Sequence, residues 1–470
     1  MRRGLVLGIA IFASGIGMLA ASLGLAEEST VLDRYVASPD PNYHYDLIST
    51  IPGDGYTGFV LEMTSQQWRT AAEVDRPIWK HWLTIVVPQQ LKTRIGALVI
   101  SGGSIFSKPP ARINPLAAAL AKTTGSVVSE LRMVPNQPLT FAEETRQRSE
   151  DAIIAYSWDK FLRTGDATWP LRLPMTKSAV RAMDAITAFC GSPEGGGIIV
   201  DRFVVGGASK RGGTAWTTAA ADSRVVGIVP VVIDLLNTEP SFDHQYRAYG
   251  HWAAAVRDYE GMRIMDWADT PQFRALMRIE DPYFYRDRLT MPKFIVNSAG
   301  DQFFLPDSSQ FYFDALMGEK YLRYVPNTDH SLKGTGTDAA ESAIAFYESI
   351  VSGTSRPEFT WRFEDDGSIR VRTSTTPREV RLWQAANTAT RDFRLQTIGP
   401  AYTSSVLMDE GGGTYVGRVV PPSHGWVAYF VEMTFPGPNS DSFKFTTGVR
   451  VMPEFLPFGP PPRADSAGAH

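Results

Sequence analysis

Short continuous apolar runs and helix-spaced apolar positions alternate along the central part of the chain. Runs of four to eight residues between turn signals are typical of strands buried on both faces. Such runs lie within residues 95–103, 126–135, 201–209, 225–236, 291–301 and 320–331. Between them, apolar residues recur at helical spacing at 174–191, 210–221 and 337–351. The alternation predicts an α/β fold, with a mostly parallel sheet flanked by helices.

Two segments depart from this alternation. Upstream, residues 56–68 and 78–88 are aromatic and β-branched with partial alternation, which predicts an antiparallel pair of strands. Residues 237–285 are rich in Tyr, Trp and His and have a helical pattern, between two core strands. An insertion where parallel strands end lies over the crevice in which open α/β sheets bind ligands. We therefore predict a helical cap insertion at about 237–285.

The pattern changes again after residue 354. Short alternating runs separated by Gly, Pro and Asn fill residues 355–456 and predict a small C-terminal β-sandwich. The main α/β domain accordingly spans 27–354. The composition of 457–470 predicts a disordered tail.

The N-terminus has the pattern of an export signal. Arg2 and Arg3 precede an unbroken apolar stretch from Gly4 to Ala26, and Gly24 and Ala26 fit the small-residue cleavage pattern. We therefore predict a signal peptide at 1–26 and a secreted or periplasmic protein, with no membrane span after cleavage. The alternative is an uncleaved anchor, because the stretch is long enough to span a bilayer.

The net charge and the sequence motifs limit the classes of partner, metal and cofactor that we expect. A formal net charge of −4 provides no basic field for steering nucleic acid, so we expect no nucleic-acid partner. No HExxH or paired metal-ligand spacing occurs, and no glycine motif matches a nucleotide-binding loop, so we expect neither a metal nor a cofactor. Cys190 is the single cysteine, which excludes an intrachain disulfide and favours a buried structural thiol.

One segment carries the pattern of a serine nucleophile. In "VVGGASKRGGTAW" (204–216) an apolar run leads into Ser209, and a helix-like sequence follows. A nucleophilic serine on a strand-to-helix turn normally has small residues two positions before and after it. Gly207 meets this requirement, but Arg211 does not, and the next glycines stand at 212 and 213. Taken alone, the motif leaves an ordinary turn serine as an alternative.

A serine nucleophile needs a base to take its proton and an acid to orient that base. Asp301 directly follows the apolar run at 291–300, and His330 lies in the loop after the next run. This is the chain order serine, acid, histidine of serine hydrolases with a parallel sheet. We predict Ser209, Asp301 and His330 as catalytic residues, with Asp307 as the rival acid. Singly, Asp301 and His330 are also compatible with ordinary turn and loop residues.

Further residues are candidates for binding the reacting groups. An oxyanion hole needs two backbone N–H donors, which we assign to Lys210 and to Gly102 or Gly103, with a plain tight turn as the alternative for the glycine pair. For substrate binding we predict Arg211, Tyr249 and Trp252. The alternatives are a structural ion pair for Arg211 and core packing for the two cap rings.

Several longer strings resemble the PhoPQ-activated pathogenicity-related protein family. They include "IPGDGYTGFVLEMTSQQW", "GGASKRGGTAW", "DPYFYRDRLTMPKFIVNSAGDQFFLPDS" and "VPNTDHSL", and the resemblance spans about residues 30–350. It implies a secreted protein with an α/β-hydrolase fold, in which Ser209, Asp301 and His330 stand at triad positions. It also implies that Arg211 is a feature of the family.

Together these observations predict a secreted serine hydrolase that cleaves an ester or amide bond of a small-molecule or peptide substrate. Two alternatives remain open. The string Ser-Lys-Arg-Gly-Gly is similar to the Ser-Lys-Gly-Gly of some secreted prolyl-type aminopeptidases, which favours a serine peptidase. A hydrolase fold also serves non-catalytic extracellular signalling or binding proteins.

Overall fold

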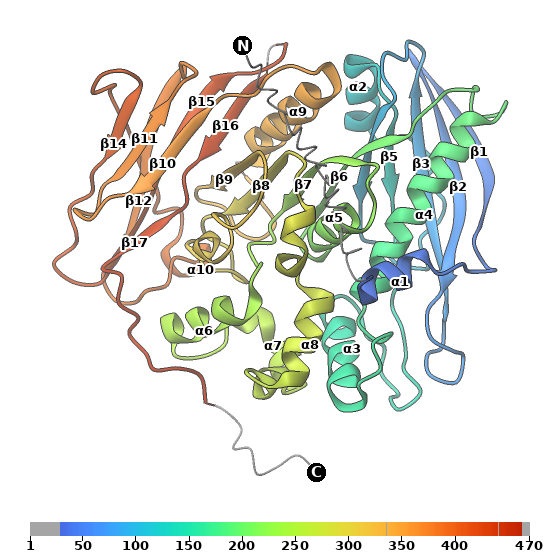
Figure 1. Cartoon of the computed structure of the whole chain (residues 1–470), viewed down its shortest axis with the longest axis horizontal. Helices are drawn as coiled ribbons and strands as arrows, with labels where there is room; N and C mark the ends of the chain where they lie inside the picture. The colour runs from blue at the N-terminus through green and yellow to red at the C-terminus, as the bar shows by residue number, and fades with distance from the viewer. Residues whose placement is uncertain (1–28, 335, 440, 463–470) are drawn as a thin grey trace, which may run out of the picture.

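The computed structural model describes residues 29–334, 336–439 and 441–462. The predicted signal peptide at 1–26 and residues 463–470 of the predicted tail lie outside this range. In the described residues, one sheet of 14 strands runs through the molecule in the order β1-β2-β3-β5-β4-β6-β7-β8-β9-β16-β15-β12-β13, with β17 paired to β15. Figure 1 shows the N-terminal strands at one edge of the molecule and the C-terminal strands at the other.

The central strands of this sheet are parallel, as the sequence pattern predicts. In order across the sheet they are β5 (Val128–Leu131), β4 (Ile95–Ile100), β6 (Arg202–Ala208), β7 (Val225–Val231), β8 (Lys293–Ser298) and β9 (Lys320–Val325). Antiparallel strands extend one edge, namely β1 (His44–Gly53), β2 (Tyr56–Gln67) and β3 (Ile78–Pro88). The pair β2–β3 is the predicted antiparallel pair.

Helices pack on both faces of the parallel strands, and successive strand residues point to opposite faces. Leu98 and Val205 belong to the core that includes α1 (Val31–Ala37), α4 (Arg172–Gly191) and α5 (Lys210–Ala221). Their neighbours Ala97 and Val204 pack instead with residues of α2 (Pro115–Thr124) and α9 (Gly336–Ser352). The predicted α/β class is confirmed.

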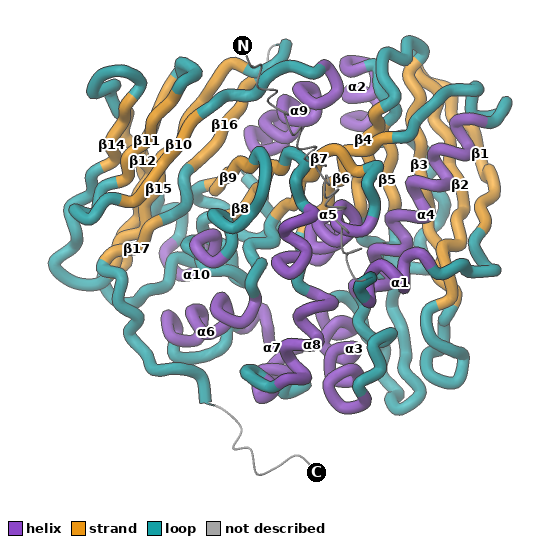
Figure 2. Tube along the Cα trace, in the orientation of Figure 1, coloured by secondary structure: helices purple, strands orange, loops and turns teal. Residues whose placement is uncertain are grey.

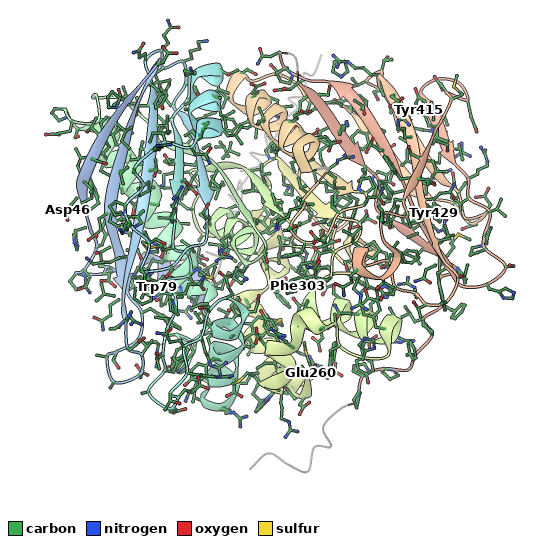
Figure 3. All side chains as sticks on the ribbon, turned by 180° about the vertical axis from the view of Figure 1, so that it is seen from behind. Asp46, Trp79, Glu260, Phe303, Tyr415 and Tyr429 are labelled. Carbon is green, nitrogen blue, oxygen red and sulfur yellow. The ribbon has the colours of Figure 1, made fainter. Side chains whose placement is uncertain are left out.

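The predicted helical cap is present between β7 and β8. It contains α6 (Thr238–Tyr249), α7 (Arg257–Gly261) and α8 (Pro271–Glu280), with 3-10 helices at Ala254–Val256, Ile264–Trp267 and Pro282–Arg288. Figure 2 shows these helices grouped with α3 (Asp151–Thr164) on one side of the strands. In Figure 3, Glu260 of the cap lies at the edge of the molecule, whereas Phe303, after β8, lies near its centre. Phe242 and Tyr259 of the cap line one cavity with Ser209 and Phe303, which follow β6 and β8, so the cap faces the carboxyl ends of these strands.

The C-terminal region forms two antiparallel layers. One is a separate sheet of β10 (Phe359–Phe363), β11 (Ile369–Thr373) and β14 (Thr414–Gly417). The other continues the central sheet through β12 (Glu379–Asn387), β13 (Thr403–Val406), β15 (Trp426–Pro436), β16 (Ser442–Thr446) and β17 (Arg450–Met452), while α10 (Leu395–Ile398) lies between β12 and β13. This second layer joins the parallel strands where Thr446 of β16 pairs with Leu322 of β9. The small sandwich thus shares its core with the α/β part, because Phe443 and Phe445 pack with Phe294 of β8.

The first part of the predicted tail departs from the expectation of disorder. The N–H of Phe458 donates to the carbonyl oxygen of Arg247 at 3.0 Å. Gly250, at the end of α6, leaves room for the Phe458 ring, because a Cβ there would lie 2.8 Å from it. The apolar Phe458 side chain thereby gains a partner on the cap, so residues 457–462 follow the cap surface.

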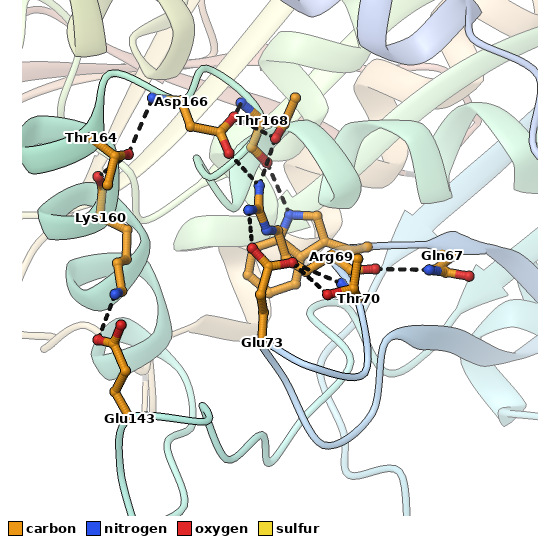
Figure 4. Close-up of polar contacts among 10 residues, drawn as sticks. Gln67, Arg69, Thr70, Glu73, Glu143, Lys160, Thr164, Asp166 and Thr168 are labelled. Carbon is orange, nitrogen blue, oxygen red and sulfur yellow. Dashed lines mark hydrogen bonds and ion pairs between the residues drawn. The ribbon is translucent and has the colours of Figure 1, made fainter.

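A polar cluster ties the β2–β3 connection to the loop before α4. The Arg69 guanidinium donates to Asp166 Oδ2 at 2.8 Å and to Thr168 Oγ1 at 2.6 Å, and it also pairs with Glu73 (Figure 4). It lies 3.9 Å from the centroid of the Trp169 ring. Charge-assisted hydrogen bonds are stronger than neutral ones. The cluster therefore fixes the β2–β3 connection to the loop between α3 and α4.

Candidate active site

Ser209 occupies the turn between β6 and α5. Its backbone has φ 56° and ψ −128°, a strained conformation for a residue other than glycine. Two hydrogen bonds hold the turn: the Ser209 N–H donates to Val231 O at 2.7 Å, and the Gly213 N–H donates to Ser209 O at 3.0 Å. Such strain persists where surrounding structure enforces it, and it raises the serine side chain above the sheet.

The glycines around Ser209 explain why arginine is accepted two residues later. A Cβ at Gly207 would lie 2.6 Å from the carbonyl oxygen of Arg211, and a Cβ at Gly212 would lie 2.9 Å from Gly207 O. The close backbone approach therefore involves Gly207 and Gly212. Position 211 needs no small side chain, because its side chain points away from this contact toward Glu150.

Asp301 and His330 meet above the ends of β8 and β9. His330 Nδ1 lies 2.8 Å from Asp301 Oδ2, while Asp301 Oδ1 accepts a hydrogen bond from the Phe303 N–H at 2.7 Å. The Asp301 side chain is 3% exposed and that of His330 is 16% exposed. The Phe303 ring packs against the imidazole at a centroid distance of 4.4 Å. With Nδ1 engaged by the carboxylate, the imidazole is oriented and its Nε2 is left for the nucleophile.

Ser209 and His330 line one cavity of about 520 Å³, together with Gly102 and Arg211. Among the described residues no hydrogen bond joins the Ser209 hydroxyl to His330. Catalytic hydrogen bonds are often long before substrate binds, so the shared cavity is the relevant geometric relation.

Backbone N–H groups are available beside Ser209. Lys210 is the first residue of α5, and the first N–H groups of a helix have no partner within it. Gly102 and Gly103 follow β4, and among the described residues their N–H groups donate no hydrogen bond; Gly102 lines the cavity that contains Ser209, whereas Gly103 does not. Their carbonyl oxygens do have partners: Gly102 O accepts from the Met133 N–H at 3.0 Å, and Gly103 O accepts from Gln137 Nε2 at 3.3 Å.

Glu150 connects this loop to the serine turn, and sequence reasoning missed it. Its carboxylate receives Arg211 Nη1 at 2.8 Å, Arg211 Nη2 at 2.6 Å and Lys210 Nζ at 2.7 Å. Burial alone raises the pKa of Glu150, but hydrogen bonding and the charges of Arg211 and Lys210 prevail and lower this pKa to about 2. The sequence signal that could have indicated such a partner is the pair of adjacent cations, Lys210 and Arg211, after Ser209. Two buried cations require a nearby carboxylate.

Arg211 therefore takes the structural role that we kept as its alternative. Besides the bidentate pair with Glu150, its Nε donates to Val134 O at 2.6 Å. The guanidinium also lies under the glycine loop, because a Cβ at Gly102 would be 2.7 Å from Arg211 Nη2. Arg211 thus supports the loop that carries the candidate oxyanion donors.

A second cavity, of about 70 Å³, is lined by Ser209 and by residues of the cap. Its wall combines aromatic and charged side chains, including Trp158, Phe242, Tyr259, Phe303, Phe304, Asp151, Arg172, Lys210 and Glu280. The cap is linked to the serine turn through this wall. The Tyr259 hydroxyl donates to Asp151 Oδ1 at 3.0 Å, and Asp151 Oδ2 lies 3.1 Å from Lys210 Nζ.

The two cap rings that we predicted for substrate binding lie elsewhere. Neither Tyr249 nor Trp252 lines a described cavity that contains Ser209. Tyr249 is 8% exposed and packs with Leu305, and the Arg394 guanidinium lies 4.4 Å from the centroid of the Tyr249 ring. Trp252 packs edge-on against Tyr246 at a centroid distance of 5.0 Å. These rings stabilise the cap, and Phe242 and Tyr259 take the positions near Ser209.

The rival acid, Asp307, is held away from His330. Its Oδ2 lies 2.6 Å from Arg391 Nη2 and 3.1 Å from His244 Nε2, and its side chain is 6% exposed. Burial raises the pKa of Asp307, but the His244 and Arg391 charges outweigh burial and hold this pKa well below its usual range. Asp307 thus joins α6 of the cap to the loop between β12 and α10.

A third carboxyl group near the site is buried without a cation. Asp234 follows β7 and accepts hydrogen bonds of 2.6 Å from the hydroxyls of both Tyr312 and Tyr324. Burial raises the pKa of Asp234 to about 7, although the two tyrosine hydrogen bonds oppose the rise. The folded protein therefore retains a proton on Asp234 in a pH range where the unfolded chain has lost it.

This difference predicts a pH dependence of stability. Between about pH 4, the value for an unfolded aspartate, and about pH 7, the free energy of unfolding decreases as pH rises, because the folded state binds the extra proton. Asp234→Asn removes this contribution. Urea unfolding at pH 5 and pH 8 should show a decrease for the wild type that is larger by about 3 kcal/mol than for the variant. Equal pH dependence in the two proteins contradicts the assignment.

Other features of the described residues bear on the chemistry. No group of three or more His, Cys, Asp or Glu side chains gathers there in a way that could hold a metal ion. The described helices include none that is both long and apolar enough to span a bilayer. Cys190 is buried, and burial raises the pKa of its thiol to about 12. A thiol with that pKa is not a nucleophile at neutral pH.

Comparisons with known proteins give a relative in sequence and alignments with solved structures. Autocrine proliferation repressor protein A of Dictyostelium discoideum is 37% identical over 469 residues, covering 94% of this chain and 94% of that protein. Acetyl xylan esterase 1 from Thermoanaerobacterium sp. aligns with a TM-score of 0.46 at 16% identity, over 67% of this chain and 92% of that chain. A glucuronoyl esterase from Solibacter usitatus aligns with a TM-score of 0.39 at 12% identity, over 69% and 91%.

A family model described as PhoPQ-activated pathogenicity-related protein matches residues 32–394. That match covers the parallel sheet, the serine turn, the cap and both loops that carry Asp301 and His330. The chain therefore belongs to the PhoPQ-activated pathogenicity-related protein family, and its sheet has the α/β-hydrolase fold.

Proposed function

We propose that this protein is a serine hydrolase that cleaves an ester or amide bond through an acyl-enzyme. One observation carries the proposal: the strained turn at Ser209 opens into the same cavity as His330, whose Nδ1 is hydrogen-bonded to Asp301. Serine, base and orienting acid are the three groups that acyl transfer to a hydroxyl requires.

The reaction proceeds in two halves. Ser209 Oγ attacks the carbonyl carbon while His330 Nε2 takes the hydroxyl proton, and Asp301 stabilises the imidazolium. His330 then gives the proton to the leaving alcohol or amine, and the acyl group stays on Ser209. Water, deprotonated by His330, attacks the acyl-enzyme, and the proton returns to Ser209 as the acid leaves.

The backbone N–H groups of Lys210 and of Gly102 or Gly103 supply the oxyanion hole in this proposal. They act on the negative charge that develops on the carbonyl oxygen, and they need no rearrangement if their loop is held in place. The Glu150–Arg211 pair beneath Gly102 provides that support.

Hydrolysis of p-nitrophenyl acetate and of aminoacyl p-nitroanilides tests the proposal and separates esterase from peptidase activity. Wild-type protein should release p-nitrophenol or p-nitroaniline catalytically, and Ser209→Ala should lose this turnover. Ser374→Ala changes an exposed serine that directly follows β11 of the separate sheet and lines neither cavity with Ser209, so it should keep this turnover. Turnover by Ser209→Ala equal to that of the wild type rejects Ser209 as the nucleophile.

Arg211→Met tests the support of the oxyanion loop. We expect kcat to fall by about 10²-fold with little change in KM, because a displaced donor weakens stabilisation of the transition state. Stability should decrease by about 1–3 kcal/mol, as expected for lost hydrogen bonds to a charged group. Arg211→Lys should restore part of the stability but little of kcat, since lysine cannot make the bidentate pair. A rise in KM at constant kcat would instead indicate that Arg211 binds substrate.

The name of the Dictyostelium relative favours a second candidate function. Autocrine proliferation repressor protein A is named for repression of proliferation, so a member of this family could act as an extracellular signal by binding. In that case a Ser209→Ala protein would retain its effect on cells. Under the hydrolase proposal, any effect of the wild type on cells is lost with Ser209.

We also propose that the hydrolase is exported. The basic start and the apolar stretch from Gly4 to Ala26 support a cleaved signal peptide. N-terminal sequencing of the protein recovered outside the cytoplasm should give Glu27 as the first residue. Recovery of the intact N-terminus in a membrane fraction would favour the anchor.

A further inference from the structure

Among the described residues, neither α2 nor α9 covers the strip of the central sheet that lies between these two helices. Strand register pairs Val99 with Gly206 and Gly206 with Val229, and it pairs Ala208 with Val231, so these residues lie on one face. Val99 is 43% exposed, although central parallel strands are normally covered on both faces. Gly206 and Ala208 have little or no side chain, which leaves a hollow between the flanking valines.

Two helices form the walls of this hollow. Leu116 and Leu120 of α2 line one side, and Ala343, Ile344 and Tyr347 of α9 line the other. The resulting groove is the 520 Å³ cavity that contains Ser209 and His330. This volume is within the range of about 300–1,000 Å³ that small-molecule sites occupy.

Polarity is distributed unevenly along the groove. Its charged or titratable lining groups are His330 and Arg211, beside Ser209, and Tyr347 on α9. Arg211 is already paired with Glu150, and the Tyr347 hydroxyl is hydrogen-bonded to Ser126 Oγ at 2.6 Å. Strands and helices supply aliphatic side chains along the rest. A polar ligand would lose hydrogen bonds to water there, whereas an aliphatic chain would gain by leaving water.

We propose that this groove binds the acyl chain of a medium- or long-chain carboxylic ester, with the ester carbonyl at Ser209. The inference rests on the proposed function and names its substrate class. The groove reaches from Ser209 back to Val204, about 17 Å at the rise of a strand. An extended chain covers that length with roughly 14 bonds, three for each peptide residue. An acyl chain of about fourteen carbons therefore fills it, and a ten-carbon chain fills about two thirds of its length.

A binding experiment tests the groove without requiring catalysis. Full-length Ser209→Ala protein is titrated with 11-dansylaminoundecanoic acid, and the increase in dansyl fluorescence is measured. We expect saturable binding that decanoate displaces and acetate does not. Adding Val99→Asp at the floor or Leu116→Asp at the wall should weaken binding at least tenfold, because each places a carboxylate in the apolar groove.

The control lies on the same helix as Leu116. Ala119 is exposed on α2 and does not line the groove, so Ala119→Asp adds the same charge outside it and should leave binding unchanged. Absence of saturable binding overturns the inference. Equal weakening by Leu116→Asp and Ala119→Asp also overturns it.

Activity on p-nitrophenyl esters from acetate to dodecanoate separates this inference from the proposed function. In the wild type, kcat/KM should rise by up to about fourfold for each methylene until the groove is full, which corresponds to about 0.8 kcal/mol per methylene. Leu116→Asp should flatten the rise, and Ala119→Asp should keep it. If hydrolysis depends on Ser209 but does not vary with chain length, the acyl-chain groove is rejected and the proposed hydrolase function stands. If the dansyl acid binds but no hydrolysis depends on Ser209, the proposed hydrolase function is rejected and the binding groove stands.

Discussion

Asp301→Asn is expected to lower kcat about 10⁴-fold without unfolding the protein. Asp301 holds His330 Nδ1 at 2.8 Å, which fixes the imidazole tautomer and stabilises the imidazolium that forms when Ser209 loses its proton. An amide presents a different hydrogen-bonding pattern to Nδ1 and carries no charge, so both contributions are lost. Steady-state kinetics on an ester that the wild type cleaves measure the effect, with circular dichroism as the check of folding.

Asp307→Asn is the matched comparison for this prediction. The two aspartates follow the same strand, but the Asp307 carboxylate is engaged by Arg391 and His244 and does not contact His330. The kcat of folded Asp307→Asn should stay within a fewfold of the wild type. If Asp307→Asn lost activity and Asp301→Asn kept it, the assignment of the orienting acid would be wrong.

The second large effect concerns stability. Asp307→Ala should lower the free energy of unfolding by about 3–5 kcal/mol, because it leaves the Arg391 guanidinium buried without its carboxylate. The Arg391 side chain is only 3% exposed, so water cannot replace the lost partner without rearrangement. Urea unfolding at pH 7 measures the change.

A double variant controls for the loss of packing. Asp307→Leu combined with Arg391→Met replaces both charges by apolar groups, so it should be less destabilised than Asp307→Ala alone. Equal destabilisation would mean that packing rather than the unpaired charge explains the loss. A change below about 1 kcal/mol for Asp307→Ala would place the pair among weak surface ion pairs.

Much of the fold could be predicted because buried parallel strands have a distinctive pattern. Continuous apolar runs at 95–103, 201–209 and 291–301 contain β4, β6 and β8, and the change of composition at 237–285 marked the cap. The positions of Ser209, Asp301 and His330 followed from strand ends and chain order, since functional residues in such sheets gather at the carboxyl ends of strands. Their catalytic roles stay predictions until activity is measured.

Features that depend on long-range packing could not be predicted. Nothing in the local pattern at Glu150 shows that it pairs with Arg211, because the two residues lie far apart in the chain and meet only where the start of α3 lies near the start of α5 in the folded protein. Tyr249 and Trp252 have the aromatic character of pocket residues, yet Tyr249, at the end of α6, faces Arg394, and Trp252, in the loop that follows, packs against Tyr246. Short alternating strands likewise do not reveal that β16 joins β9 and extends the central sheet.

Fluorophosphonate labelling tests the central claim most directly, because the probe reacts with an activated serine without any knowledge of the substrate. Intact-protein mass spectrometry of the wild type should show one covalent adduct, and peptide mapping should locate it at Ser209. Ser209→Ala should show none, and Asp301→Asn should label much more slowly. A wild-type protein that forms no adduct, or a Ser209→Ala protein that labels as readily as the wild type, would contradict the account.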